Sequence, residues 1–486
     1  MKITQCKVNH MENPIGYQHR HLTFSWIADC RGSLESRIVI SSAGQVVKDT
    51  GWAKLDMAAT TLDVELKPRT RYEWTVAVCN EKGESITSDV NYFETGKMQE
   101  PWTAQWITTT GANDRHPIFY HTLPDGADKK VTKARLYICG LGLYEAYLDG
   151  VKIGADWLTP GFNAYHLWVQ TQTYDVTEMM QSRPKELSIL AGDGWYKSRI
   201  PFEGSSVGFY GNDYRVLAEL HIEYADGSKE VLSTDESWQV RRSNITFSGI
   251  YDGEWQDETL PQGEVEAVAI ATPLKGQLID RLSVPVRTHE EFHPALVSND
   301  AGETILDIGQ NLAGIFTLRV HIPKGQRVHI QAGEVLQDGH FYRDNLRTAK
   351  AEFYYTSDGE EHIVRPHFTF YGFRYLKIEG IENFDPKDIT VHALYSDMPM
   401  NSQLMTGHAK LNQFLSNVSW GMKSNFVDLP TDCPQRDERM GWTGDSQVFS
   451  ETACFLAQPY AFYRKYLYDM EQEQKNADGC APDFVP

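Results

Sequence analysis

The densest group of ionisable side chains in this chain lies in one short segment that runs from Asp428 to Asp445. Carboxylates and guanidinium groups alternate there, and prolines and glycines restrict and shape the backbone. The charged members are Asp428, Asp432, Arg436, Asp437, Glu438, Arg439 and Asp445. Glycoside hydrolysis requires two carboxyl groups, one of which donates a proton to the departing oxygen. The segment is therefore a candidate for that chemistry.

The local sequence leaves the roles of two carboxylates open. A proton donor needs a raised pKa, which nearby acids or an indole favour and nearby arginines oppose. Glu438 has both kinds of neighbour in the sequence. From composition alone, a salt-bridged loop between two helices explains the cluster equally well. Asp445 precedes a helical stretch and could serve as its N-cap, which does not exclude a place in a binding site.

The segment from Asp432 to Asp445, DCPQRDERMGWTGD, resembles the signature of the bacterial α-L-rhamnosidases of glycoside hydrolase family 78. Further motifs resemble β-domains of that family and follow one another in the family's order along the whole chain. They are Tyr147-Leu-Asp-Gly150, Tyr251-Asp-Gly-Glu254, Asp307-Ile-Gly-Gln-Asn-Leu-Ala-Gly314, Ala332-Gly-Glu-Val-Leu336, Asn345-Leu-Arg347 and Pro366-His-Phe-Thr-Phe-Tyr-Gly-Phe-Arg-Tyr375.

The resemblance implies an inverting hydrolase that removes terminal non-reducing α-L-rhamnose from rhamnosides. By position, Glu438 matches the general acid, and Asp432 and Arg436 match residues that bind the rhamnose hydroxyls. Trp442 matches an aromatic wall near the sugar's methyl group, and Asp445 matches another carboxylate of the pocket. A deoxysugar offers one apolar corner, which suits an indole, and hydroxyls, which suit charged, bidentate groups.

The resemblance also implies a general base, a Glu in a later part of an (α/α)6 barrel, which we expect beyond residue 486. Six helical hairpins need on the order of 250–350 residues at typical helix and loop lengths. Residues 399–486 supply about a quarter of that length. We therefore expect this chain by itself to be an inactive or weakly active fragment, a truncated product or one part of a split enzyme.

The sequence around this segment predicts a multidomain protein. We expect three all-β sandwich domains followed by the truncated start of an (α/α)6 barrel. Residues 1–97 alternate between apolar and polar side chains. Their stretch from Leu66 to Val76 resembles the corner of a fibronectin type III domain, where a Tyr hydroxyl fixes the turn. We expect this domain to be structural, as a spacer.

Residues 98–285 predict a jelly-roll-like sandwich, in which Asp149-Gly150 between apolar strands indicates a hairpin. Aromatic residues in turn-rich sequence there, at 157–168 and 195–196, suggest exposed rings. Residues 286–398 alternate again and end in a closing strand from Phe373 to Ile378, which predicts a second sandwich of this kind.

Near residue 400 the hydrophobic period becomes helical. Apolar side chains recur from Leu411 to Met422, again after the segment at Val448 to Leu456, and in a third stretch over residues 461–475. All-β sequence followed by all-α sequence indicates a separate helical domain over residues 399–486. Three helices with an unpaired apolar face would leave much of that face in contact with water.

Composition limits the partners. A net charge of −20 argues against nucleic acid and anionic membranes. The 7 cysteines lack zinc-binding spacing and the N-terminus lacks a signal peptide, so we expect reduced thiols and a cytoplasmic location. The mechanism requires no metal or cofactor, although a structural calcium stays open. The expected partner is a rhamnose-containing glycoside or oligosaccharide, and a homodimer stays open.

Two other functions compete with a rhamnosidase. One is a rhamnose- or glycan-binding protein of β-modules with a vestigial helical tail, which the expected truncation favours. The other is a hydrolase of a different sugar on the same barrel, which the match from Asp432 to Asp445 disfavours. The aromatic content of 12% suits sugar binding and β-sandwich cores alike.

Overall fold

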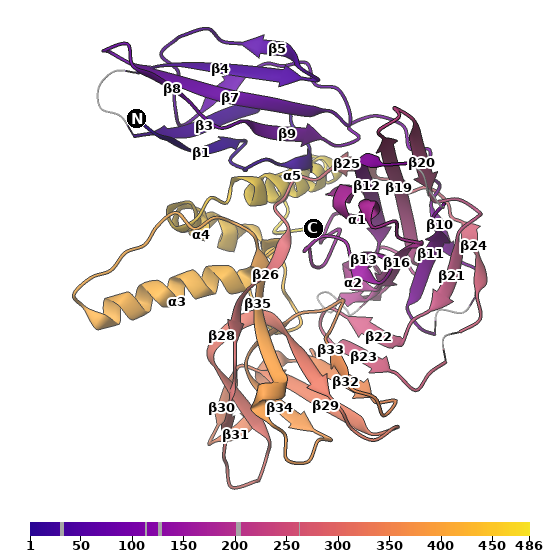
Figure 1. The fold of residues 1–486 in the computed structure, drawn as a ribbon. Helices are drawn as coiled ribbons and strands as arrows, with labels where there is room; N and C mark the ends of the chain where they lie inside the picture. The colour runs from indigo at the N-terminus through magenta and orange to yellow at the C-terminus, as the bar shows by residue number, and fades with distance from the viewer. Residues whose placement is uncertain (30–33, 112–113, 125–128, 201–205, 262) are drawn as a thin grey trace.

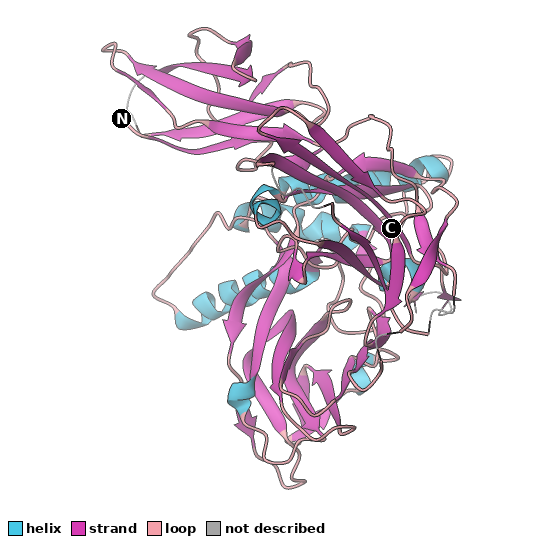
Figure 2. Ribbon diagram, turned by 45° about the vertical axis from the view of Figure 1, so that its right-hand side comes forward, coloured by secondary structure: helices cyan, strands magenta, loops and turns pink. Residues whose placement is uncertain are grey.

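The computed structural model describes residues 1–486 apart from 30–33, 112–113, 125–128, 201–205 and 262. Over these residues the chain forms an N-terminal sandwich, a second and a third β unit, and a helical unit (Figure 1). Figure 2 shows that the long helices lie together, in the angle between the N-terminal sandwich and the third β unit. Within the described ranges, no helix is long and apolar enough to cross a lipid bilayer.

The N-terminal sandwich packs a three-stranded sheet on a six-stranded one. The small sheet has the order β1 (Ile3–Val8), β3 (Leu22–Ala28), β6 (Thr60–Leu62). The large sheet has the order β2 (Ile15–Tyr17), β9 (Asn91–Thr95), β7 (Arg71–Asn80), β4 (Leu34–Ser42), β5 (Gln45–Asp49), with β8 (Ser85–Thr87) on β7. Alternate residues of β7, including Tyr72 and Trp74, are buried between the sheets. The Tyr72 hydroxyl accepts a hydrogen bond from Lys67 N at 2.8 Å, so the predicted tyrosine corner is confirmed.

The second β unit is built on one twelve-stranded sheet. Its order is β14 (Val151–Lys152), β13 (Leu143–Leu148), β16 (Glu186–Gly192), β11 (Pro117–Thr122), β21 (Gln239–Arg242), β24 (Glu266–Ile270), β10 (Ile107–Thr109), β19 (Arg215–Tyr224), β12 (Val131–Leu141), β15 (Trp168–Asp175), β25 (Gln277–Asp280), with β20 (Lys229–Ser233) on β19. Short elements α1 (Thr177–Gln181), α2 (Gly194–Lys197), β17 (Arg199–Ile200) and β18 (Ser206–Val207) complete it. Asp149 and Gly150 have φ values of 45° and 77° in the β13–β14 turn, which confirms the predicted hairpin.

The aromatic residues that we expected to be exposed in this unit are largely buried. Trp168, Trp195 and Tyr196 are each less than 5% exposed. The Trp195 ring stacks on Phe162 with centroids 5.2 Å apart, and Trp168 Nε1 donates to a carboxylate of the helical unit, Asp469. The expectation of exposure was wrong because other parts of the fold cover these rings, and local sequence does not reveal that cover.

The third β unit forms a ten-stranded sheet that takes two strands from outside the predicted range 286–398. Its order is β22 (Ile245–Gly249), β23 (Gly253–Asp257), β32 (Glu352–Thr356), β29 (Arg327–Gly333), β34 (Tyr371–Glu379), β28 (Ile305–Val320), β35 (Ile389–Ser396), β26 (Val286–Phe292), with β27 (Ala295–Val297) and β33 (His362–Val364) on β28. Hairpin β30 (Val335–Gln337) and β31 (His340–Tyr342) and the 3-10 turns η1 (Asp344–Leu346) and η2 (Pro386–Asp388) complete it. Since β23 pairs in parallel with β32, the sheets do not divide at residue 285.

The helical unit contains the three predicted helices, α3 (Ala409–Asn425), α4 (Thr443–Leu456) and α5 (Tyr460–Asn476), and the short strands β36 (Phe426–Val427), β37 (Leu429–Pro430), β38 (Gly441–Trp442) and β39 (Phe484–Val485). The His408 side chain caps α3 by accepting from Leu411 N. Phe414 on α3 and Val448 on α4 are exposed, so apolar surface remains in contact with solvent as the sequence predicted.

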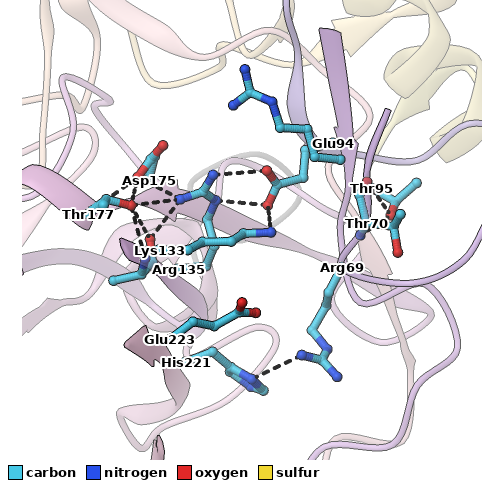
Figure 3. Close-up of polar contacts among 12 residues, drawn as sticks. Arg69, Thr70, Glu94, Thr95, Lys133, Arg135, Asp175, Thr177, His221 and Glu223 are labelled. Carbon is cyan, nitrogen blue, oxygen red and sulfur yellow. Dashed lines mark hydrogen bonds and ion pairs between the residues drawn. The ribbon is translucent and has the colours of Figure 1, made fainter. Parts of the chain in front are cut away.

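Buried ion pairs join the N-terminal sandwich to the second β unit. Glu94 of β9 is fully buried and accepts from Nε and Nη2 of Arg135 at 2.8 and 2.9 Å, with Lys133 Nζ 3.1 Å away (Figure 3). Lys97 pairs with the fully buried Glu219 close to this joint. Removing one partner of such a pair strongly destabilises the folded protein, because the other charge is left buried and unpaired. The N-terminal sandwich is therefore anchored to the second β unit, and its expected role as a structural spacer stays a prediction.

Candidate active site

The charged segment begins at a tight hairpin between β36 and β37. Asp428 has a φ of 68° in this turn, and its buried carboxylate accepts from Phe162 N at 2.7 Å. Lys465 Nζ of α5 lies 3.0 Å from the same carboxylate and 3.2 Å from Asp469, and the lysine is fully buried. A buried lysine requires such partners, because an unpaired charge there is costly. The start of the segment is thus fixed to α5 and to the second β unit.

Arg439 fixes the middle of the segment. Its buried guanidinium donates to four main-chain carbonyl groups at 2.9–3.0 Å, two within the segment and two in the third β unit. These acceptors are the carbonyl oxygens of Gln435, Arg436, Ile250 and Phe370. Burial lowers the pKa of Arg439 from its ordinary value. One side chain therefore joins the segment to the third β unit, which is a structural role that the sequence did not indicate.

Arg436 bridges the two acids that the sequence singled out as general acid and sugar ligand. Its Nη2 donates to Asp432 Oδ2 at 3.0 Å and its Nε donates to Glu438 Oε2 at 3.1 Å. Asp432 Oδ1 also accepts from Met440 N at 2.9 Å, which closes the segment into a compact loop. Carboxylate oxygens of Asp432 and Glu438 and the Cys433 Sγ atom lie within 4.8 Å of one another. The structure therefore brings Asp432, Arg436 and Glu438 into one contiguous group.

Glu438 is surrounded by hydrogen-bond donors. Trp442 Nε1 donates to its Oε1 at 3.1 Å, and Arg347 Nη2 donates to its Oε2 at 2.6 Å. Burial alone would raise the pKa of Glu438, but the hydrogen bond from Arg347 and the charge of Arg436 outweigh it, and its pKa is lowered. For Asp432, burial is the largest influence and its pKa is raised. In the resting site the surroundings of Glu438 thus favour its carboxylate form, whereas burial disfavours a charge on Asp432.

The third β unit contributes to this site through the turn after η1. Arg347 Nε lies 2.7 Å from Asp437 Oδ1, and Thr348 donates to Asp437 Oδ2 from its main-chain N at 3.2 Å and from its hydroxyl. The Tyr251 hydroxyl donates to the main-chain oxygen of Glu438 at 3.1 Å. Arg347 lies in a motif quoted for its family resemblance, but nothing in the local sequence placed it beside Glu438.

Asp445 lies outside this hydrogen-bonded group. It is an exposed residue in the first turn of α4, and Trp442, not Asp445, occupies the N-cap position, so the N-cap reading was wrong. Asp445 and Asp432 line a cavity of about 580 Å³ between α3 and α4, together with apolar side chains such as Phe426 and Phe449. The cavity offers two carboxylates and apolar walls, which is a combination that suits a deoxysugar.

Four family models match successive parts of the chain. They are the Rha78A-like N-terminal immunoglobulin domain (residues 3–99), the α-L-rhamnosidase N-terminal domain (129–290), the bacterial α-L-rhamnosidase concanavalin-like domain (298–395) and the bacterial α-L-rhamnosidase 6 hairpin glycosidase domain (399–486). The chain belongs to the bacterial α-L-rhamnosidase family. The charged segment lies inside the part that matches the 6 hairpin glycosidase domain.

Named relatives agree with these matches. An α-L-rhamnosidase of Alteromonas sp. strain LOR is 31% identical over 531 aligned residues, which cover 100% of this chain and 57% of the relative. The crystal structure of the Aspergillus terreus α-L-rhamnosidase has a TM-score of 0.92 and 30% identity, over 100% of this chain and 59% of that one. The Streptomyces avermitilis α-L-rhamnosidase, solved in complex with L-rhamnose, has a TM-score of 0.90 and 26% identity, over 100% and 66%. The chain thus spans little more than half the length of the curated relatives that cover it.

Proposed function

We propose that this chain supplies the proton donor and part of the sugar pocket of an α-L-rhamnosidase that releases terminal non-reducing α-L-rhamnose with inversion. The observation that supports the proposal best is the group of Asp432, Arg436, Glu438 and Trp442, held by hydrogen bonds of 3.0–3.1 Å within the loop that matches the glycosidase domain. The activity of the whole enzyme is inferred from relatives that are longer than this chain.

Glu438 is proposed as the general acid, which must be protonated when the glycosidic bond breaks. Its resting partners, Arg347 and Arg436, favour the carboxylate. A bound rhamnoside would engage Arg436 through its hydroxyls and exclude water, and both changes raise the pKa of Glu438. The proton would then pass from Glu438 to the leaving oxygen.

Asp432 fits the role of a sugar ligand better than that of a general base. An inverting pair of carboxyl groups stands roughly 6.5–9.5 Å apart, to leave room for a water molecule. Carboxylate oxygens of Asp432 and Glu438 lie within 4.8 Å of each other, with Arg436 between them. We therefore propose that Asp432 and Arg436 bind hydroxyl groups on the same side of the sugar.

Trp442 and Asp445 are proposed to complete the recognition of rhamnose. The indole of Trp442 is partly buried and offers an apolar surface for the methyl group, while its Nε1 stays bound to Glu438. Asp445 faces the cavity that Asp432 also lines. Its carboxylate is proposed to accept hydrogen bonds from a hydroxyl that Asp432 and Arg436 do not reach.

We also propose that α3, α4 and α5 are the first helices of an (α/α)6 barrel. The match of residues 399–486 to a 6 hairpin glycosidase domain supports this proposal. The exposed apolar side chains Phe414, Val448 and Phe455 support it as well, because further helices would bury them.

Hydrolysis of p-nitrophenyl α-L-rhamnoside tests the proposed activity. It should be measured in a polypeptide that carries this chain and the remainder of the glycosidase domain, beside p-nitrophenyl glycosides of other sugars. Release of rhamnose with inverted anomeric configuration, followed by NMR, is the expected result. Rhamnose binding without turnover would favour the glycan-binding alternative, and turnover of another sugar with none of the rhamnoside would contradict the proposed specificity.

A further inference from the structure

Arg347 of the third β unit contacts two neighbouring acids of the segment, Asp437 and Glu438, with one guanidinium group. Its Nε lies 2.7 Å from Asp437 Oδ1, and its Nη2 lies 2.6 Å from Glu438 Oε2. Two charge-assisted contacts from one planar group fix the orientation of both partners, which a lysine cannot do in the same way. The Arg347 side chain is nevertheless 48% exposed, so it lies at the open edge of the site.

The second β unit positions the turn that carries Arg347. Arg199 donates from Nε and Nη2 to the carboxylate of Asp252 at 2.7 Å, and from Nη2 to the main-chain oxygen of Thr348 at 2.8 Å. Thr348 in turn binds Asp437. The turn is thus fixed at its base by the second β unit and presents its guanidinium to the charged segment of the helical unit.

The backbone of Arg347 is itself unusual. The residue follows η1 with a φ of 56° and a ψ of −113°, in a region that residues other than glycine rarely adopt. Such a conformation costs free energy and persists only where the surroundings enforce it. The contacts of Thr348 and Arg199 supply that enforcement.

Both oxygens of Glu438 are occupied in this arrangement. Oε1 accepts from Trp442, and Oε2 accepts from Arg436 and Arg347. Two donors occupy both lone-pair directions of Oε2, so this oxygen can carry a proton only after its contact with Arg436 or with Arg347 breaks. Arg347 is more exposed than Arg436, at 48% against 35%, and Asp437 would retain its guanidinium after the contact breaks.

We propose that Arg347 is a positioning residue for Glu438, which it orients in the resting site and releases when a rhamnoside enters, while Asp437 keeps the guanidinium at the edge of the site. The inference rests on the proposed function of Glu438 as the acid. The other titratable groups beside Glu438 are Asp432, Cys433, Arg436 and Asp437 of its own segment and Tyr251, whose hydroxyl donates to the main-chain oxygen of Glu438. Arg347 is thus, among the described residues that contact the Glu438 carboxyl, the one supplied by another unit.

The test compares Arg347→Met with Arg347→Lys and with a control, Arg374→Met. Arg374 forms a two-bond ion pair with Asp307 in the same β unit, with similar exposure, and does not contact the segment. The chain is labelled with glutamate carrying ¹³C in the side-chain carboxyl group, and Glu438→Gln identifies the signal of Glu438. This titration requires no enzymatic activity.

Removing a cation that favours the carboxylate raises the pKa of Glu438. The titration midpoint should therefore move to higher pH in Arg347→Met, return part of the way in Arg347→Lys, and stay unchanged in Arg374→Met. In the complete enzyme, the basic limb of the kcat/KM profile, which reports the free acid, should move in the same direction. An unmoved midpoint in Arg347→Met, or an equal movement in Arg374→Met, would overturn the inference.

Failure of the proposed function has a different outcome. If the enzyme turns over no rhamnoside but the midpoint of Glu438 moves as stated, Arg347 still positions this carboxylate and the assigned reaction is wrong. If rhamnoside is hydrolysed and neither the midpoint nor the basic limb moves, the assigned reaction stands and the role of Arg347 is wrong.

Discussion

Trp442 and Glu438 form a hydrogen-bonded pair in which the indole Nε1 donates to the carboxyl Oε1 at 3.1 Å. The two residues lie four positions apart on the same loop. An indole N–H only donates, so the contact fixes which oxygen of Glu438 faces the ring and leaves the other for its arginine partners. The apolar wall proposed for the sugar and the proposed proton donor are therefore positioned by one contact.

Replacing Trp442 by Phe tests that relationship. The change keeps an apolar ring and removes the donor to Glu438. A lost hydrogen bond of this kind costs about 0.5–1.5 kcal/mol, so we expect kcat on p-nitrophenyl α-L-rhamnoside to fall several-fold with a smaller change in KM. Trp442→Ala should additionally raise KM, because it removes the wall. Equal kinetics for the Phe variant and the unaltered enzyme would show that the contact does not orient the acid.

Deleting residues 1–97, or replacing Glu94 by Gln, should destabilise the remainder of the fold. Glu94 is fully buried against Arg135, and the loss of one partner of a buried pair costs on the order of 3 kcal/mol. Thermal unfolding of Glu94→Gln should begin at a clearly lower temperature. Arg37→Met serves as a control, because its pair with Asp49 in the same sandwich is exposed and its loss should change little. A deletion variant as stable as the whole chain would favour the spacer interpretation.

The stability contributed by Asp280 should fall as the pH rises. Burial raises its pKa to about 6 from an ordinary value of 3.8, and its carboxyl accepts from the main-chain N atoms of Lys97 and Met98. Between these two values the folded state binds more protons than the unfolded state, so folding becomes less favourable with increasing pH across that window. The stability advantage of the unaltered chain over Asp280→Asn, from chemical denaturation, should be larger at pH 4 than at pH 7. The opposite trend would refute the raised pKa.

Arg439 should matter for the order of the loop as well as for stability. Arg439→Met removes the donor of four main-chain carbonyl groups, and the two that are buried, those of Ile250 and Phe370, each cost about 1–3 kcal/mol when unsatisfied. We expect faster amide hydrogen exchange in residues 428–442 and a lowered unfolding temperature. Arg374→Met provides the comparison with an exposed pair on the third β unit. Unchanged exchange in the loop would argue that its prolines alone hold it.

Local patterns in the sequence predicted the local parts of this structure. Alternation along Tyr72 and Trp74, the Asp149-Gly150 turn and the helical period from Leu411 to Met422 each depend on neighbours a few residues apart, and each is confirmed. The sequence could also predict the group of Asp432, Arg436 and Glu438, because one short loop contains all three residues.

Contacts between distant segments could not be predicted in this way. The pairing of β23 with β32 joins strands about a hundred residues apart, and the contact of Arg347 with Glu438 spans 91 positions. The burial of Trp168 depends on cover from Tyr468 and Asp469 of the helical unit. Hydrophobic period and turn chemistry say nothing about such partners, because the free energy of these contacts comes from tertiary packing.

The proton-donor role of Glu438 is tested most directly by the dependence of Glu438→Gln on the leaving group. The amide keeps the shape and can still accept from Trp442, but it cannot give a proton. We predict a loss of roughly 10²–10⁴-fold in kcat/KM on rhamnosides with poor, alcohol-like leaving groups. The loss should be far smaller on 2,4-dinitrophenyl α-L-rhamnoside, whose leaving group departs without a proton. An equal loss on both substrates, or full activity on both, would contradict the assignment of Glu438 as the acid.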